Sequence, residues 1–170
     1  VGQELSAVSI CHYLNQNDFV VSNHRGHGHF IAHTNDVCLL VSELLGKSSG
    51  ASKGIGGSQH LFYKNFLSNG IQGNMSPVSA GMAYAEKLYS KDRIVTIFIG
   101  DGTLGEGAVY ETLNLISLLN LPLLVVLEDN DIAQSTPQNK YLSGTIKGRA
   151  TAFGIKYLET TTLDVEDLFK

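Results

Sequence analysis

Short runs of β-branched and aromatic residues alternate along the chain with longer stretches in which apolar residues recur at helical spacing. Every residue of the run Ile94–Ile99 is β-branched or aromatic, which is typical of a strand buried on both faces in a parallel sheet. Phe19–Ser22, Leu123–Leu127 and Ile155–Glu159 have the composition of further strands. The sequence therefore predicts several strands separated by helices.

The helical stretches between these runs each have an apolar face. They are Gln3–Gln16, Asp36–Leu45, Ser76–Tyr89, Leu104–Leu119 and Asp164–Lys170. The residues expected to face the core are Leu5, Val8, Cys11 and Leu14 in the first helix, Val37, Leu40, Val41, Leu44 and Leu45 in the second, Val78, Met82, Ala85 and Leu88 in the third, and Val109, Leu113, Ile116 and either Leu119 or Leu118 in the fourth. Gly81 is expected to mark close packing. The alternation predicts an α/β fold, a doubly wound, mostly parallel sheet with helices on both faces.

Composition and charge set limits on the partners. The chain has 170 residues, of which 43% are hydrophobic and 16% charged, so we expect a single domain over residues 1–170. The net charge of −4 gives no electrostatic reason to expect nucleic acid or an anionic membrane as a partner, and no apolar run is long enough to cross a bilayer. Cys11 and Cys38 form neither a CxxC pair nor a disulfide framework, which favours a cytoplasmic location.

A turn rich in glycine follows the central strand. Gly100 and Gly102 can adopt positive φ and let backbone N–H groups approach an anion. We expect a helix to begin near Leu104 with the positive end of its dipole toward the same point. This combination predicts a phosphate site, with the Asp101 carboxylate at its apex.

The spacing of Gly100, Gly102 and Gly105 also fits the fingerprint of dinucleotide-binding proteins. Asp101 would then place a carboxylate against a pyrophosphate with no cation between them. The segment about 20 residues further on, Asn120–Leu124, lacks the acidic residue that binds the ribose. A nicotinamide-dependent oxidoreductase is therefore the less favoured alternative.

A divalent cation removes the conflict between Asp101 and a phosphate. Magnesium takes one or two protein oxygen ligands together with phosphate oxygens and water. The strand Leu123–Leu127 runs into Glu128–Asp131, so oxygen-bearing side chains follow the carboxyl end of a second strand. The sequence thus predicts that Asp101 and residues 128–131 converge on a magnesium diphosphate.

Asp101, followed 29 residues later by Asn130, resembles the thiamine diphosphate motif. Other stretches add to this resemblance in the same order along the chain: Gly2–Glu4, His24–His29, Glu43–Lys47, Ser52–Ser58 and Ser135–Pro137. Through nearly its whole length the chain is similar to the alpha subunit of the decarboxylating first component of 2-oxo acid dehydrogenase complexes, of the pyruvate, branched-chain and acetoin types. Since it lacks an initiator Met, we expect the chain to be a fragment of a longer alpha subunit.

The resemblance implies a thiamine diphosphate-binding fold and the roles of individual residues. It assigns Asp101, Asn130 and the backbone carbonyl of Ile132 to magnesium. It assigns to cofactor binding His24, Arg25, Gly70, Gln72, Gly100, Asp101, Gly102, Thr103 and Asn130. Arg25 matches an arginine that binds the diphosphate, which suits the forked guanidinium group. Gln72 replaces an aliphatic residue that is usual in the family, and Asp129 replaces a common asparagine.

Four histidines, His24, His27, His29 and His33, lie close together in the sequence. They could form a transition-metal site, bind backbone groups of their own loop, or act as donors near the diphosphate or the substrate. Among them His27 is the candidate catalytic residue.

Two further segments and two glutamates have expected roles. From composition alone Lys47–His60 would be a flexible linker, whereas the resemblance implies an ordered loop near the site. Gln138–Arg149 resembles the start of a mobile loop at the active-site entrance. Glu106 and Glu111 are expected to be charges in solvent or at an interface.

The resemblance implies thiamine diphosphate-dependent decarboxylation of a 2-oxo acid with transfer of the acyl group to a lipoyl group. The implied partners are a beta subunit, in an alpha2beta2 enzyme, and a lipoyl-bearing acyltransferase. Acetoin cleavage and a homologue that is not catalytic are the alternatives. For a eukaryotic source, the implied location is the mitochondrial matrix or a plastid.

Overall fold

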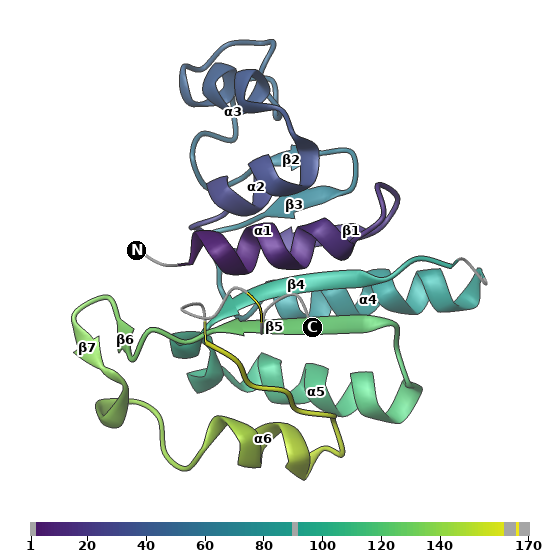
Figure 1. The fold of residues 1–170 in the computed structure, drawn as a ribbon, viewed down its shortest axis with the longest axis vertical. Helices are drawn as coiled ribbons and strands as arrows, with labels where there is room; N and C mark the ends of the chain where they lie inside the picture. The colour runs from purple at the N-terminus through teal and green to yellow at the C-terminus, as the bar shows by residue number, and fades with distance from the viewer. Residues whose placement is uncertain (1–2, 90–91, 162–165, 167–170) are drawn as a thin grey trace. The chain divides into compact units, whose positions relative to one another are not determined.

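The computed structural model describes residues 3–89, 92–161 and 166 (Figure 1). The chain divides into two compact units, unit 1 with Val1–Ile71 and Thr160–Lys170, and unit 2 with Gln72–Glu159. The expectation of one domain over residues 1–170 stays a prediction. The helix expected over residues 164–170 lies outside the described residues, apart from residue 166.

Unit 1 consists of helices packed against short strands. Its elements are α1 (Glu4–Tyr13), β1 (Phe19–Ser22), α2 (His27–Thr34), α3 (Val37–Leu44), β2 (Phe62–Tyr63) and β3 (Phe66–Ser68). β1 pairs with β3 in parallel, with Val20 opposite Phe66, and β2 pairs with β3 antiparallel. The rings of Phe30 and Phe66 meet edge to face with centroids 5.0 Å apart, and both side chains are fully buried. The strand expected at Phe19–Ser22 is confirmed, whereas β2 and β3 were not expected because each is too short to show a periodic pattern.

Unit 2 contains the strand and the turn on which the phosphate prediction depends. Its elements are α4 (Met75–Leu88), β4 (Val95–Gly100), the 3₁₀ helix η1 (Asp101–Gly105), α5 (Gly107–Leu119), β5 (Leu123–Glu128), β6 (Ile132–Ala133), β7 (Thr136–Pro137), the 3₁₀ helix η2 (Gln138–Lys140) and α6 (Ile146–Ala152). β4 and β5 are parallel, from Val95 opposite Leu123 to Gly100 opposite Glu128. This register brings the carboxyl ends of the two strands side by side.

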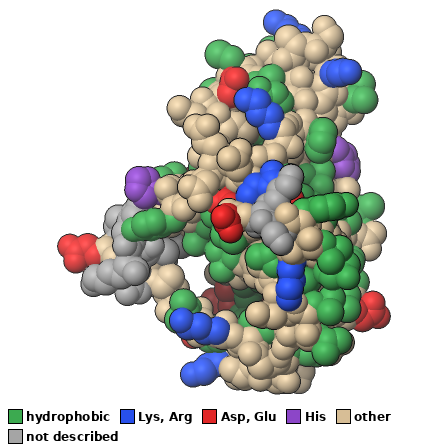
Figure 2. Space-filling model, turned by 90° about the vertical axis from the view of Figure 1, so that its right-hand side faces the viewer, with side chains coloured by type: hydrophobic (Ala, Val, Ile, Leu, Met, Phe, Trp, Pro, Cys, Tyr) green, Lys and Arg blue, Asp and Glu red, His purple; other side chains and the backbone are tan. Residues whose placement is uncertain are grey.

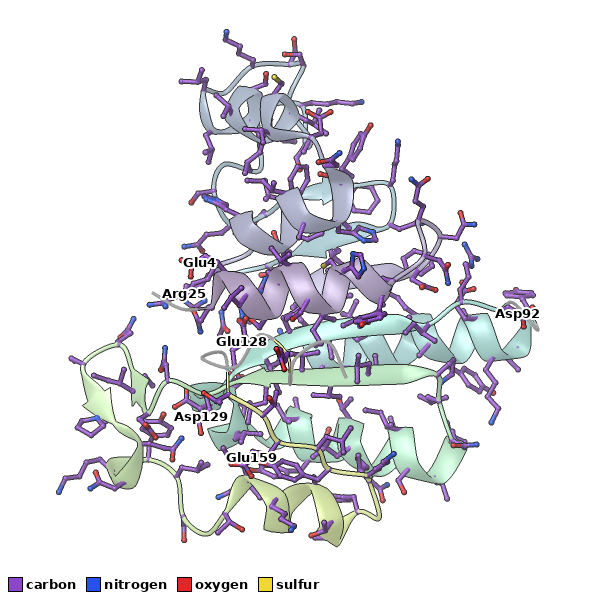
Figure 3. All side chains as sticks on the ribbon, in the orientation of Figure 1. Glu4, Arg25, Asp92, Glu128, Asp129 and Glu159 are labelled. Atoms are coloured by element: carbon purple, nitrogen blue, oxygen red, sulfur yellow. The ribbon has the colours of Figure 1, made fainter. Side chains whose placement is uncertain are left out.

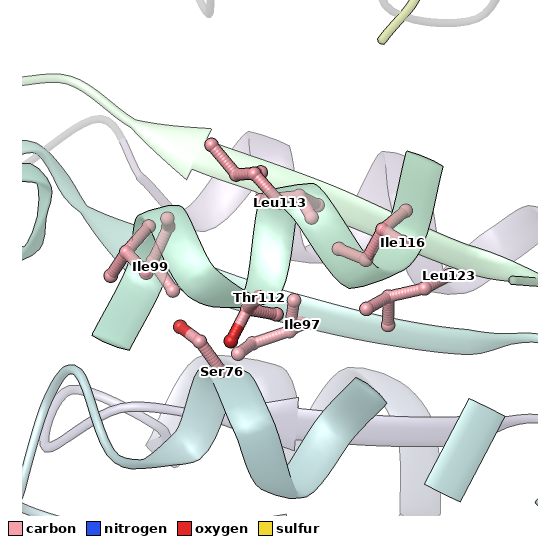
Figure 4. Close-up of a pocket in the computed structure, with 9 residues that line it drawn as sticks. Ser76, Ile97, Ile99, Thr112, Leu113, Ile116 and Leu123 are labelled. Atoms are coloured by element: carbon pink, nitrogen blue, oxygen red, sulfur yellow. The ribbon is translucent and has the colours of Figure 1, made fainter. Parts of the chain in front are cut away.

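The core of unit 2 lies between this strand pair and two helices. Ile97 and Ile99 of β4 face Leu113 and Ile116 of α5, and Ser76 of α4 completes the layer (Figure 4). A cavity of about 10 Å³ remains between them. Since one water needs roughly 10–15 Å³ and several polar partners, this cavity is a packing gap and not a ligand site.

The buried faces of α1 and α4 differ from those that the sequence predicts. The buried side of α1 consists of Ser6, Ala7, Ser9 and Cys11, while Val8 is exposed. In α4 the buried residues are Met75, Ser76, Ser79, Ala80, Ala83 and Glu86, while Val78 and Leu88 are exposed. Small residues occupy the buried side because they allow close approach. Figure 2 shows that hydrophobic side chains are common on one face of the molecule. In α5 the expected Val109, Leu113 and Ile116 are buried, as predicted, whereas Leu119 is half-buried and Leu118 is exposed.

α3 departs from its predicted role in a different way. Only Leu40 and Glu43 are buried, while Val37, Val41, Leu44 and Leu45 are exposed. The helix begins after Asp36, whose carboxylate accepts a hydrogen bond from the Leu39 N–H at 2.8 Å, and the chain reverses at Gly46 with φ +67°. The expected boundaries are correct, but a charged residue takes a place in the core.

Two other local expectations are wrong. Ile155–Glu159 forms no strand, because no neighbouring strand pairs with it in the part of the chain that the structure describes. Gly81 is exposed, and a Cβ there would have no atom within 4 Å, so it marks no close packing. The α/β class itself is confirmed by a parallel strand pair in each unit, with helices between the two strands of each pair. Among the described residues, no helix combines the length and apolar character needed to cross a membrane.

Candidate functional site

Asp101 lies where the fold predicts a ligand site, directly after the buried strand β4. Its side chain is only 3% exposed. Because Gly100 pairs with Glu128, Asp101 and Asp129 follow the paired ends of two parallel strands, and Glu128 and Asp129 mark the end of β5 in Figure 3. The carboxyl edge of parallel strands is where α/β proteins bind ligands.

Two side chains from a later segment bind the Asp101 carboxylate. The Tyr141 hydroxyl and the Gln138 amide both donate to Asp101 Oδ2, the amide at 3.3 Å. The same Gln138 Nε2 donates to Asp129 Oδ1 at 2.7 Å. Burial, the hydrogen bond to Asp101 and nearby carboxylates raise the pKa of the Tyr141 hydroxyl, so it stays a donor at neutral pH. Oδ1 of Asp101 receives no hydrogen bond from the described residues and is left for another ligand.

The residues after β5 fold into a tight turn. Asp129 Oδ1 accepts from the Asp131 N–H at 3.1 Å, and Asn130 Oδ1 accepts from the Ile132 N–H at 3.2 Å. Asp131 has φ +62°, a conformation that Asp and Asn tolerate. An amide oxygen has two lone pairs, so Asn130 Oδ1 keeps one for a cation. Both Asn130 and Ile132 are exposed to solvent.

The donors at this edge suit magnesium. They are carboxylate, amide and carbonyl oxygens, which magnesium prefers, and a single buried carboxylate meets its modest need for protein ligands. No group of three or more His, Cys, Asp or Glu residues that could bind a metal occurs among the described residues. The transition-metal site considered for His24, His27, His29 and His33 is therefore wrong.

The turn at Gly100–Gly105 differs from its expected geometry. Gly100 is extended, with φ −88° and ψ 160°, and Gly102 has no positive φ either. Residues 101–105 form a 3₁₀ helix in which Thr103 is buried, and α5 begins only at Gly107, not near Leu104. Gly102 is needed for close packing, since a Cβ there would lie 2.9 Å from the Ala133 Cβ of β6.

Glu106, at the N-cap of α5, has a structural contact that the sequence did not indicate. Its Oε1 accepts a hydrogen bond from the Gly73 N–H at 3.0 Å. A Cβ on Gly73 would overlap the same carboxylate, so a larger residue at this position would displace the Glu106 side chain. Glu106 is exposed to solvent, as expected, and its carboxylate also binds the Gly73 N–H.

The remaining predicted residues of the N-terminal half lie in or next to unit 1. Arg25 is exposed, and its Nη1 donates to Gln3 Oε1 at 3.2 Å (Figure 3). Gly26 packs against the Ser22 hydroxyl, since a Cβ would lie 2.9 Å from that oxygen. His24 is exposed, and His29 is buried with its Nδ1 2.8 Å from Ser22 Oγ.

His27 is the first residue of α2, so the motif predicted as a loop already contains a helix start. Its Nε2 lies 2.9 Å from the Ser58 carbonyl oxygen. A carbonyl can only accept, so Nε2 carries the proton and Nδ1 is the free nitrogen of the neutral ring. His27 is half-buried, with access for a ligand.

Gly70 and Gln72 follow β3, at the boundary between the two units. A Cβ on Gly70 would overlap the Gln59 side chain, and the Asn69 carboxamide accepts from the Ile71 N–H at 2.8 Å. The Gln72 carbonyl accepts from the Met75 N–H at the start of α4. Gly70 therefore belongs to unit 1 and Gln72 to unit 2.

Tyr141 and Gln138 are the site residues that sequence reasoning missed. They lie 40 and 37 residues after Asp101, in the segment expected to begin a mobile loop. No local pattern connects a tyrosine or a glutamine to a carboxylate so far away in the sequence. The only signal was that polar residues follow Pro137, close to the end of β5.

Comparisons with known proteins agree on one family. The model of the family described as "Dehydrogenase E1 component" matches residues 1–169. The chain is 38% identical over 172 residues to the alpha subunit of acetoin:2,6-dichlorophenolindophenol oxidoreductase from Cupriavidus necator, covering 99% of this chain and 51% of that protein. It is 36% identical over 170 residues to the pyruvate dehydrogenase E1 alpha subunit of Zymomonas mobilis, covering 97% and 48%. Against the same subunit from Rickettsia prowazekii, identity is 31% over 174 residues, covering 99% and 53%. The chain thus spans about half the length of these relatives.

Proposed function

Because the chain belongs to the dehydrogenase E1 component family, we propose that it is part of the alpha subunit of a thiamine diphosphate-dependent enzyme that decarboxylates a 2-oxo acid and passes the acyl group to a lipoyl group. Members of this family typically use thiamine diphosphate and magnesium. The observation that carries the proposal is the buried carboxylate of Asp101 at the carboxyl end of β4, next to the oxygen-rich end of β5.

In this proposal Asp101, Asn130 and the Ile132 carbonyl bind magnesium. Tyr141 and Gln138 occupy Oδ2 of Asp101, so the carboxylate turns a fixed Oδ1 toward the cation. Asn130 presents the remaining lone pair of its amide oxygen. Thr103, Gly100 and Gly102 shape the turn around these oxygens.

When bound, thiamine diphosphate supplies the carbon nucleophile that adds to the 2-oxo acid, so the protein has to anchor and orient it. Arg25 provides a forked, exposed guanidinium group for the diphosphate, and removal of such a charged hydrogen bond costs about 1.5–3 kcal/mol. His24, Gly70 and Gln72 belong to the proposed cofactor-binding set. His27 is proposed to exchange a proton with the substrate through Nδ1, since its Nε2 is bound to Ser58.

The proposed partners are a beta subunit, in an alpha2beta2 enzyme, and a lipoyl-bearing acyltransferase. The relatives support the first partner because they are named as alpha subunits. The proposed location is the cytoplasm, or the mitochondrial matrix or a plastid in a eukaryote.

Acetoin is the second candidate substrate. The acetoin oxidoreductase alpha subunit of Cupriavidus necator, at 38% identity, favours it. A steady-state assay of the assembled enzyme with acetoin, pyruvate and branched 2-oxo acids, using dichlorophenolindophenol as electron acceptor, distinguishes the two.

A charge-neutralising substitution tests the metal assignment. Asp101→Asn keeps the side-chain shape but removes the negative charge, so we expect magnesium-dependent binding of thiamine diphosphate to weaken by roughly tenfold to a hundredfold. The measurement is calorimetric titration of the full-length chain assembled with its beta subunit.

Asp131→Asn is the matched control. This substitution removes one negative charge near the same strand ends. The Asp131 side chain, however, is exposed and is not one of the proposed magnesium ligands. We expect binding within about threefold of the wild type, the usual range for a surface substitution. Equal losses in the two variants would contradict a specific role for Asp101.

A further inference from the structure

Among the described residues of unit 1, Glu43 is the most completely enclosed charged residue. Its side chain, on α3, is 1% exposed. Oε2 accepts hydrogen bonds from the N–H groups of Ser52 at 2.7 Å and Gly54 at 2.9 Å. Oε1 accepts from Gly56 at 2.7 Å and Gly57 at 3.2 Å. Four backbone donors from one loop therefore converge on a single buried carboxylate.

The glycines of this loop, residues 47–60, are needed for it to close around Glu43. A Cβ on Gly50 would lie 2.5 Å from the Glu43 Cα, and one on Gly54 would lie 2.5 Å from the Gly46 carbonyl carbon. Gly54 and Gly57 also have positive φ. The composition that resembled a flexible linker thus belongs to a loop wrapped closely around one side chain.

The ordered loop also contacts His27 through a hydrogen bond. Ser52 Oγ donates to the His60 carbonyl at 3.0 Å and accepts from the Phe62 N–H at 2.9 Å, which ties the end of the loop to β2. Between these fixed points, the residue after Gly57 is Ser58, whose carbonyl accepts the Nε2–H of His27 at 2.9 Å. The residue whose N–H is bound by Glu43, Gly57, is therefore the direct neighbour of the residue whose carbonyl sets the His27 tautomer.

We propose that Glu43 is a positioning residue that fixes the loop 47–60 and, through the Ser58 carbonyl, the orientation and tautomer of His27. With the loop in place, Nε2 keeps the proton and Nδ1 is available as an acceptor. The catalytic use of that acceptor rests on the proposed function, whereas the coupling between Glu43 and His27 does not.

The arrangement requires a carboxylate and not merely a polar side chain. Glutamine has the same length, but its amide nitrogen would face two N–H donors in place of one acceptor oxygen. Hydrogen bonds to a buried charged acceptor are worth about twice those to a neutral one. Glu43→Gln should therefore open the loop without leaving a cavity.

Amide hydrogen exchange followed by mass spectrometry on the full-length chain tests the first link. In Glu43→Gln we expect peptides covering residues 50–58 to exchange roughly tenfold to a hundredfold faster, the range for loss of a charged hydrogen bond. Exchange at the wild-type rate would overturn the proposal.

Chemical modification tests the second link, which a purely structural role would not affect. Diethylpyrocarbonate modifies accessible imidazole nitrogens, so the rate at His27, followed by peptide mapping, should rise severalfold in Glu43→Gln relative to the exposed His12 in the same sample. An open loop with an unchanged rate at His27 would overturn the positioning role.

Glu86→Gln provides the matched control. Glu86 is also a buried glutamate, but it lies in unit 2 and binds Arg93 with Nε 2.7 Å from Oε2. We expect this variant to leave both the loop exchange and the His27 modification rate at wild-type values. Matching changes in Glu86→Gln would mean that the effects follow from general destabilisation, and would overturn the proposal.

If Glu43→Gln fails to fold, Glu43→Asp is the second variant. Aspartate keeps the charge, but its side chain is shorter by one methylene group. We therefore expect faster hydrogen exchange in the loop and faster modification of His27, both with smaller amplitude. Wild-type values of both would overturn the proposal. Neither readout uses thiamine diphosphate. Failure of cofactor binding would therefore refute the proposed function while leaving this inference standing, and the reverse also holds.

Discussion

Thr96 in the middle of β4 has a buried hydroxyl group with no hydrogen-bond partner among the described residues. The side chain is 0% exposed, so water does not replace the missing partner. A buried polar group without a partner costs about 1–3 kcal/mol of stability. Thr112 of α5 offers the contrast, since its equally buried hydroxyl donates to the Ala108 carbonyl at 2.8 Å.

Thr96→Val should therefore stabilise the protein. Valine has nearly the same shape and suits a strand, so we expect the free energy of unfolding, measured by urea denaturation of the full-length chain, to rise by about 1 kcal/mol. The same change at Thr112 removes a hydrogen bond that is made, and should give no increase. A stability gain of equal size in both variants would contradict this explanation.

At the level of the element, α3 and the loop 47–60 depend on the charge state of one residue. Burial alone would raise the pKa of Glu43, but the four backbone donors outweigh it and lower the pKa below its ordinary value. A carboxyl whose pKa is lower in the folded state contributes stability above its unfolded pKa of about 4.3. That contribution disappears as the pH falls through the folded value.

The sign of this effect gives a prediction. We expect the difference in the free energy of unfolding between the wild type and Glu43→Gln to be constant above about pH 5 and to shrink as the pH falls below about 4.3. Denaturation curves across this range measure it, and carboxylates common to both proteins cancel in the difference. A difference that grows with acidification would show that Glu43 is not ionised in the folded protein.

The same element shows what sequence patterns can and cannot indicate. The ends of α3 were predictable because Asp36 and Gly46 are local signals for a helix start and stop. The burial of Glu43 was not, because its partners lie 9 to 14 residues away in a loop whose composition suggests flexibility. Likewise Asp101 and Asn130 could be predicted as candidate ligands from strand ends, but their contacts with Tyr141 and Gln138 depend on the folded chain.

At the scale of the whole molecule, the candidate residues are divided between the two units. Arg25 and His27 belong to unit 1, whereas Asp101, Asn130 and Ile132 belong to unit 2. The chain also spans about half the length of its relatives. Activity is therefore a property to measure on the assembled full-length protein.

The central claim is that this chain binds thiamine diphosphate through magnesium. The most direct test is calorimetric titration of thiamine diphosphate into the full-length chain mixed with the candidate beta subunit encoded next to it, with and without magnesium. We expect saturable binding that requires magnesium and is abolished by a chelator. Absence of binding in the assembled complex with magnesium present would contradict it, and would favour a homologue that has lost the cofactor and in which Gln72 and Asp129 replace the usual residues.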